Sequence, residues 1–222
     1  GSSLVIIGRS GTGKSVLIKC ILDLEKYDEG TIHINKIENS NKNSKTFYDQ
    51  FGMLFQGGAL FDSIPIWENI SFRLLRGNQK ISRSDAKQLA SEKLKLVGLN
   101  SDIIDLYPSE LTGGMQKRVA LARAIAGDPK VIFFDEPTTG LDPIMANVIN
   151  RLIREIVVEM GVTAITITHD INSTRIIADD VAMLDSGKVQ WKGEINHLDN
   201  SGNKMVDQFI NGLATGPISN NY

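Results

Sequence analysis

Apolar residues along the chain first form short continuous runs, which are typical of strands buried within a sheet. Four such runs are Leu4–Ile7, Phe51–Gln56, Lys130–Glu136 and Val162–Asp170. Residues Glu29–Asn35 instead alternate apolar and polar, as a half-exposed strand does. The asparagine-rich stretch Asn35–Lys45 predicts a surface loop. Val181–Gly193 predicts a hairpin that turns at Ser186 and Gly187.

Apolar residues at helical spacing lie between these strands. Ser15–Glu25 is a predicted helix after the first strand, and Met145–Met160 is another between the last two buried strands. Residues 82 to 126 predict two more helices, the second over Met115–Ala126. The first has an apolar face, a start that Ser84 can cap and an end at Gly98; its apolar residues are Ala86, Leu89, Ala90, Leu94 and Val97. The alternation of strands and helices indicates an α/β fold with a helical insertion between about residues 75 and 127.

The composition of the 222 residues is that of an ordinary globular protein, with 41% hydrophobic and 23% charged residues. The formal net charge of -2 argues against a nucleic-acid binder, which usually has a basic excess. One cysteine excludes a disulfide within the chain, and no apolar run approaches the roughly 20 residues that span a bilayer. The first residues also lack the features of a secretory signal. We predict one domain over residues 1–200 and a C-terminal helix and tail over residues 201–222.

The segment GRSGTGKS, Gly8–Ser15, links the first predicted strand to the first predicted helix. Glycines in such a turn let backbone N–H groups point at phosphate oxygens, and the helix adds the positive end of its dipole. Lys14 is then placed to reach the β- and γ-phosphates, and the Ser15 hydroxyl to bind Mg²⁺. The residues expected to bind the nucleotide here are Gly8, Arg9, Ser10, Gly11, Thr12, Gly13, Lys14, Ser15 and Val16.

Two adjacent acids end the apolar strand VIFFDE. By itself such a pair is usually a solvated strand end, but after a phosphate loop it has a specific use. Asp135 is expected to hold Mg²⁺ through a water molecule. Glu136 is expected to act as the general base on the water that attacks the γ-phosphate.

Two further polar residues end buried strands, where α/β sheets bind their ligands. His169 follows the strand at Thr163–Thr168 and is expected to hydrogen-bond the γ-phosphate or the attacking water. Gln56 ends its strand in the same way and is expected to reach Mg²⁺ or that water, and to report the nucleotide state to the segment after it.

A second anion site is predicted where Thr112, Gly113 and Gly114 open the amphipathic helix in LTGGMQKRVALARAIAGDP. One chain has no need of two sites for a γ-phosphate, whereas two chains facing head to tail can each complete the other's site. This stretch resembles the signature motif of ABC-type ATPases. In the same resemblance Gly8–Ser15 is the Walker A motif, Gln56 the Q-loop, Val131–Glu136 the Walker B motif, Leu141-Asp142 the D-loop and His169 the H-loop.

The resemblance covers nearly the whole chain and implies a P-loop NTPase (RecA-like) core with a helical subdomain, ATP and Mg²⁺ as ligands, and a homodimer. Asp142 is thereby implied to lie near a nucleotide. Thr112 and Met115 replace the usual serine and glutamine of the signature. Members of the family carry a strand pair with an adenine-stacking aromatic ahead of the phosphate loop. We therefore expect an incomplete N-terminal antiparallel β-subdomain and identify no base-stacking residue.

The run MLFQGGALFDSIPIWENI after Gln56 and the closing FINGLATGPI resemble the Mla-type ATPases and related chloroplast lipid importers. That resemblance implies phospholipid transport between bacterial membranes and a peripheral place on the cytoplasmic face of the inner membrane. It also implies an integral-membrane permease, an MCE-type lipid-binding protein and a STAS-domain subunit as partners. Residues 57–69 are expected to contact the permease through Phe61, Ile64, Ile66 and Trp67, for which burial in the core is an equal alternative. Val206, Phe209, Ile210 and Leu213 are expected to form the apolar face of a terminal helix that packs, with the tail, on a partner.

Three alternatives remain at this point. The first is the ATPase of a small-solute importer or of a lipoprotein-releasing complex. The second is a soluble ABC ATPase of translation or DNA repair, although such proteins usually carry two cassettes or a long coiled coil. The third is a catalytically silent subunit, which the presence of Lys14, Asp135, Glu136 and His169 disfavours.

Overall fold

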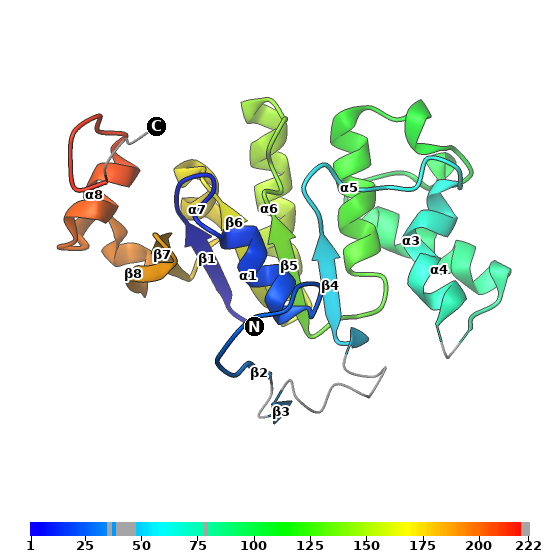
Figure 1. The fold of residues 1–222 in the computed structure, drawn as a ribbon. Helices are drawn as coiled ribbons and strands as arrows, with labels where there is room; N and C mark the ends of the chain where they lie inside the picture. Colours follow the sequence, from blue (N-terminus) through cyan, green and yellow to red (C-terminus); the bar gives the residue numbers. More distant parts are fainter. Residues whose placement is uncertain (35–36, 39–47, 78–79, 219–222) are drawn as a thin grey trace.

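A six-stranded sheet forms the centre of the molecule in a computed structural model, which describes residues 1–34, 37–38, 48–77 and 80–218 (Figure 1). The strand order is β4-β5-β6-β1-β7-β8, and all neighbours run parallel except the β7–β8 hairpin. The bounds are β1 Ser3–Ile7, β4 Phe51–Leu54, β5 Val131–Asp135, β6 Thr163–Thr168, β7 Asp180–Asp185 and β8 Lys188–Glu194. The four predicted buried strands and the predicted hairpin are thus confirmed, and their ends differ from the predicted ends by one or two residues.

The buried strands are apolar on both faces because helices cover both. Ile6, Phe133 and Ile167 pack on one face with α1 (Lys14–Ile21). The strand neighbours of Ile6 and Phe133 pack on the other face, where α6 (Pro143–Glu159) and α7 (Ile171–Ile177) lie (Figure 1). Successive side chains of a strand point to opposite faces, so a continuous apolar run is needed to fill both layers.

Three helices form a layer beside the β4 edge of the sheet, where the sequence predicts two (Figure 1). They are α3 (Ile66–Arg76), α4 (Arg83–Leu96) and α5 (Gly113–Ala124), with short 3-10 turns at Ser101–Ile103 and Pro108–Glu110. The first begins upstream of the predicted boundary near residue 75. The predicted N-cap was wrong, because the Ser82 side chain, not that of Ser84, accepts the Asp85 amide at 3.1 Å.

The start of α3 corrects part of the predicted permease surface. Ile66 is fully buried, and Trp67 is 5% exposed with the Arg83 and Lys87 side chains of α4 over its ring. These two residues are therefore core, whereas Phe61 stays 43% exposed. Trp67 is buried because α4 lies close to it, and no local sequence pattern around residue 67 indicates that contact.

Smaller corrections concern turns and loops. Helix α1 ends at Ile21 rather than Glu25, since Asp23 adopts a left-handed backbone with φ of 60°. Strand β2 covers only His33–Ile34 and pairs antiparallel with β3 (Ile37–Glu38), which lies inside the predicted loop at residues 35–45. The remainder of that predicted loop is outside the described residues.

The C-terminal segment folds back on its own helix. A 3-10 helix at Ile195–Asn200 precedes α8 (Lys204–Ile210), and buried Gln208 binds both the amide and the carbonyl of Ile218. Ile218 is itself only 5% exposed and joins the main core. Leu213 lies beyond the end of α8 and is 54% exposed, so it is not part of the predicted apolar helix face. Within the described residues, no helix has both the length and the apolar character to cross a bilayer.

Candidate functional site

The predicted phosphate-loop residues, Gln56, Glu136 and His169 meet at one edge of the sheet, where the parallel strands β1, β4, β5 and β6 all end. A cavity of about 960 Å³ opens there. Its lining residues are Arg9, Ser10, Gly11, Thr12, Gly13, Lys14, Ser15, Val16, Gln56, Glu136, His169, Ser186 and Phe209. The tertiary structure therefore brings together six segments that are far apart in the sequence, and Asp135 joins them through its hydrogen bond with Ser15.

The glycine loop is a tight cradle closed by Lys14. Lys14 is 6% exposed and donates to the carbonyls of Gly8 at 2.7 Å and Arg9 at 2.8 Å. Burial lowers the pKa of this ammonium, and the charges of Glu136 and Asp135 oppose that shift. Gly8 is required because its φ is 155° and a Cβ there would lie 2.2 Å from the Leu184 carbonyl oxygen.

Ser15 and Asp135 form an oxygen-donor pair at the base of the cradle. The Ser15 hydroxyl donates to Asp135 Oδ1 at 3.1 Å. Mg²⁺ prefers hard oxygen ligands and is usually bound by one or two carboxylates together with substrate phosphates. The donor set therefore fits Mg²⁺, and Ser15 and Asp135 would hold it. Burial raises the pKa of Asp135, and the hydrogen bond from Ser15 works in the opposite direction.

This shift predicts how Asp135→Asn changes stability with pH. A carboxyl whose pKa is raised in the folded chain stabilises it fully below the unfolded pKa of about 3.9, and loses that contribution as pH rises through the folded value. Asp135→Asn should therefore increase the free energy of unfolding near neutral pH, and the gain should vanish at about pH 3. Urea unfolding of the nucleotide-free chain across this range measures it.

Asp179→Asn is the matched control of opposite sign. Two hydrogen bonds from Arg154, at 2.8 and 3.0 Å, lower the pKa of Asp179. That carboxylate stabilises the fold above its unfolded pKa and loses the effect as pH falls through its folded value. Asp179→Asn should thus destabilise the chain near neutral pH, and an equal loss in both variants would contradict the assignment of Asp135 as a costly buried charge.

Glu136 is held in an unusual backbone conformation at the end of β5. Its φ is 48°, rare for a residue with a side chain, and its amide donates to the Ile167 carbonyl at 2.9 Å. The carboxylate accepts from the Thr139 hydroxyl at 3.1 Å and pairs with His169 Nδ1 at 2.9 Å. This arrangement aims the carboxylate into the cavity and can orient it for proton transfer.

The second predicted anion site lies apart from this cavity. Thr112 caps α5 by accepting the Met115 amide at 3.3 Å, and Asp142 caps α6 by accepting two amides at 2.9 and 3.0 Å. Neither residue lines the cavity around Lys14, and Gly113 and Gly114 do not line it either. A Cβ on Gly113 would meet nothing within 4 Å, so nothing in the described part of this chain requires glycine there.

Sequence reasoning missed several residues that line the cavity or contact its lining. Asp185 pairs with Arg9 at 3.3 Å, Ser186 and Phe209 line the wall, and Thr168 lies 3.5 Å from Glu136. Thr168 could have been predicted from the sequence, because its hydroxyl lies at a strand end, one residue before His169. Nothing in the sequence near Phe209 indicates that α8 reaches the phosphate loop.

Comparison with known proteins gives consistent matches. A family model described as "ABC transporter" matches residues 1–139. The probable ribonucleotide transport ATP-binding protein Mkl of Mycobacterium leprae is 38% identical over 98% of this chain and 63% of its own length, so this chain spans about three fifths of it. The intermembrane phospholipid transport system ATP-binding protein MlaF of Haemophilus influenzae is 37% identical over 100% of this chain and 84% of its own length.

A solved structure is similar as well. The ATP-binding cassette MJ0796, seen as a dimer in a post-hydrolysis state bound to ADP and Pi, matches with a TM-score of 0.77 at 30% identity. The match covers 87% of this chain and 85% of that one. The P-loop NTPase fold predicted from the sequence is thereby confirmed.

Proposed function

The chain belongs to the ABC transporter family, and from this we propose that it binds and hydrolyses ATP as the nucleotide-binding subunit of a membrane transporter. The observation that carries the proposal is the convergence of Lys14, Ser15, Glu136 and His169 on one cavity, with Asp135 beneath it. Lys14 neutralises phosphate charge, and Ser15 and Asp135 would hold Mg²⁺, which would polarise the phosphates. Glu136 accepts the proton of the attacking water, and His169 and Gln56 orient that water and the γ-phosphate.

We propose further that a second copy of the chain completes each site. Gly113 has open space where a Cβ would lie, and the exposed N-terminus of α5 presents the Gly113 and Gly114 amides, which have no acceptor in the backbone of their own helix and suit an anion. These features are useful only if something approaches α5 from outside the chain. The γ-phosphate held by the partner's cradle is that ligand, with Asp142 at the same interface.

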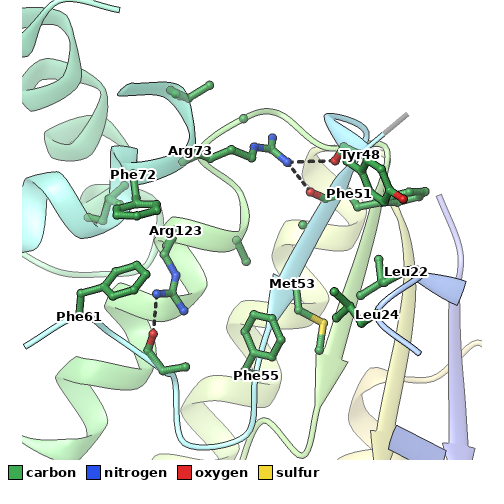
Figure 2. A pocket seen from close by; sticks show the side chains of 17 residues that line it. Leu22, Leu24, Tyr48, Phe51, Met53, Phe55, Phe61, Phe72, Arg73 and Arg123 are labelled. Carbon is green, nitrogen blue, oxygen red and sulfur yellow. Dashed lines mark hydrogen bonds between the residues drawn. The ribbon is translucent and has the colours of Figure 1, made fainter. Parts of the chain in front are cut away.

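A largely apolar groove between the sheet and the helical layer is the proposed docking site for the permease. It has a volume of about 560 Å³; Phe55 lies beside Met53 on one side of it, and Phe61 lies beside Phe72 on the other (Figure 2). Arg123 of α5 donates to the carbonyls of Gly58 and Ala59 at 2.6 and 2.7 Å. A helix seated here would contact the segment after Gln56 and, through Arg123, the helix that begins at the second anion site.

Phospholipid is the substrate that we propose. The likeness to MlaF over the whole of this chain supports it, as do the runs after Gln56 and at the C-terminus. The partners would then include an MCE-type lipid-binding protein and a STAS-domain subunit, with the chain at the cytoplasmic face of the inner membrane. The likeness to Mkl, whose name refers to ribonucleotide transport, favours a solute importer as the second candidate.

Affinity purification from gently solubilised membranes tests these proposals. We expect a multi-spanning permease and an MCE-type protein to co-purify with the tagged chain. A permease with a solute-binding protein would keep the ATPase and overturn the lipid substrate. Recovery with ribosomes or DNA and no permease would overturn the transport function.

A substitution in the groove uses the same co-purification to test whether the permease docks there. Phe55→Asp should abolish recovery of the permease, because a carboxylate in an apolar groove loses its hydration when a helix docks. Val158→Asp is the matched control, since Val158 is an exposed apolar residue of α6 that does not line the groove. Equal recovery with both variants would contradict docking at this groove.

A further inference from the structure

A buried hydroxyl connects three segments behind the proposed catalytic residues. Ser173 on α7 is fully buried, and its Oγ donates to Asp170 Oδ2 at 2.6 Å. Its single proton is used there, so the Ser173 oxygen accepts from its other neighbours. These are Asn150 Nδ2 on α6 at 2.8 Å and Thr138 Oγ1 at 3.3 Å.

The residues that Ser173 holds are covalent neighbours of the catalytic machinery. Asp170 follows His169 in the chain. Thr138 precedes Thr139, whose hydroxyl donates to the Glu136 carboxylate at 3.1 Å. His169, which pairs with Glu136 at 2.9 Å, is therefore linked to the Ser173 oxygen through Asp170, and Glu136 is linked to the same oxygen through Thr139 and Thr138.

Burial of the Asn150 amide lowers the stability of the fold, and packing alone does not explain why an amide is present there. Asn150 is 2% exposed, and its Oδ1 has no hydrogen-bond partner among the described residues. A buried amide that leaves its acceptor unsatisfied destabilises a fold, whereas an aliphatic side chain of similar size would not. The contribution of Asn150 is its Nδ2 donor, which fixes where the Ser173 oxygen lies.

We infer that Ser173, held by Asn150, is a positioning residue that sets the geometry of the His169–Glu136 pair. The inference rests on the proposed hydrolysis of ATP for its kinetic consequence. Its structural consequence, the position of the ring proton of His169, can be measured without any activity. The Glu136 carboxylate accepts a hydrogen bond from Nδ1, so it keeps the proton of a neutral His169 ring on that nitrogen. If the His169–Glu136 pair loses its geometry, that proton can move to Nε2.

The test compares Ser173→Ala with a matched buried control. Thr166→Val removes another fully buried hydroxyl, one that lies on β6 and has no hydrogen-bond partner among the described residues. Asn150→Leu/Ser173→Ala removes donor and acceptor together and keeps the fold if the single variant proves unstable. Ring ¹⁵N shifts of His169, assigned against His33→Gln and His197→Gln, give the tautomer, and steady-state ATP hydrolysis gives kcat and KM.

In Ser173→Ala and in the double variant, we expect the His169 signal to shift towards the Nε2–H tautomer. We expect kcat to fall on the order of tenfold with KM for ATP nearly unchanged, since small misplacements of catalytic groups act on the chemical step. Thr166→Val should match the wild type in both measurements. An unchanged His169 signal in the two variants, or an equal change in Thr166→Val, would overturn the inference. If the wild type does not hydrolyse ATP, the proposed function fails while the NMR measurement still decides the role of Ser173.

Discussion

Glu136→Gln is expected to bind ATP with nearly normal affinity and to hydrolyse it at least about a hundredfold more slowly, as loss of a general base typically does. The amide is isosteric with the carboxylate and keeps an oxygen to accept from Thr139, so the strained backbone at φ of 48° and the cavity should persist. What it cannot do is take a proton from water. Equilibrium binding of a fluorescent ATP analogue and single-turnover hydrolysis separate the two effects.

Glu155→Gln is the control for this variant, because Glu155 is an exposed acid on α6 outside the cavity. It should hydrolyse ATP at the wild-type rate. Turnover by Glu136→Gln within a few-fold of wild type would show that another group is the base, with His169 the nearest candidate at 2.9 Å.

Lys14→Ala should weaken ATP binding by on the order of 10- to 100-fold, the worth of a hydrogen bond to a charged group. The ammonium already lies inside the cradle, with the Gly8 and Arg9 carbonyls as its partners. The Lys14 ammonium is therefore already in position when nucleotide phosphates bind, and its desolvation has taken place during folding. Unchanged affinity would contradict the assignment of Gly8–Ser15 as the phosphate loop.

The same variant shows whether a site is shared between chains. Gly113→Asp places a carboxylate at the second anion site and should abolish hydrolysis, although a Cβ at Gly113 has open space among the described residues. Mixing Gly113→Asp with Lys14→Ala creates mixed dimers with one intact cradle facing one intact α5, so hydrolysis should reappear. Mixing Lys14→Ala with a chain carrying both substitutions restores no site and is the control. No recovery in the first mixture would mean that each chain builds its site alone.

Local chemistry made much of the site readable in the sequence. The phosphate loop is contiguous, and Asp135 and Glu136 are adjacent at a strand end, so their types and spacing carried the prediction without knowledge of contacts. The buried strands were predictable for the same reason, because a parallel sheet covered on both faces needs unbroken apolar runs. Gly98 also fits, since a φ of 69° after α4 favours glycine.

Other features depended on partners distant in the sequence. Helix α3 was missed because its buried face includes Asn69 and Ser71, whose polar atoms are satisfied by the Phe61 and Ala86 backbones, so the helix lacks a purely apolar stripe. Trp67 belongs to the core only because α4 lies over it. Phe209 reaches the cavity only because the hairpin β7–β8 carries α8 to that end of the sheet.

The sequence by itself determined the chemical groups of this protein, namely the phosphate loop, the paired acids, the strand-end histidine and the glycines that open α5. Each is a short segment whose function follows from residue type and spacing. The tertiary structure alone decided which of these groups meet. Parallel strands end at a common edge and so unite Lys14, Asp135, Glu136 and His169, whereas Thr112–Gly114 begin a helix in another layer and remain apart from them. It also decided that Ser173 and Asn150 stand behind the site, because hydrogen bonds between α6, α7 and the loop after β5 form only once the chain has packed.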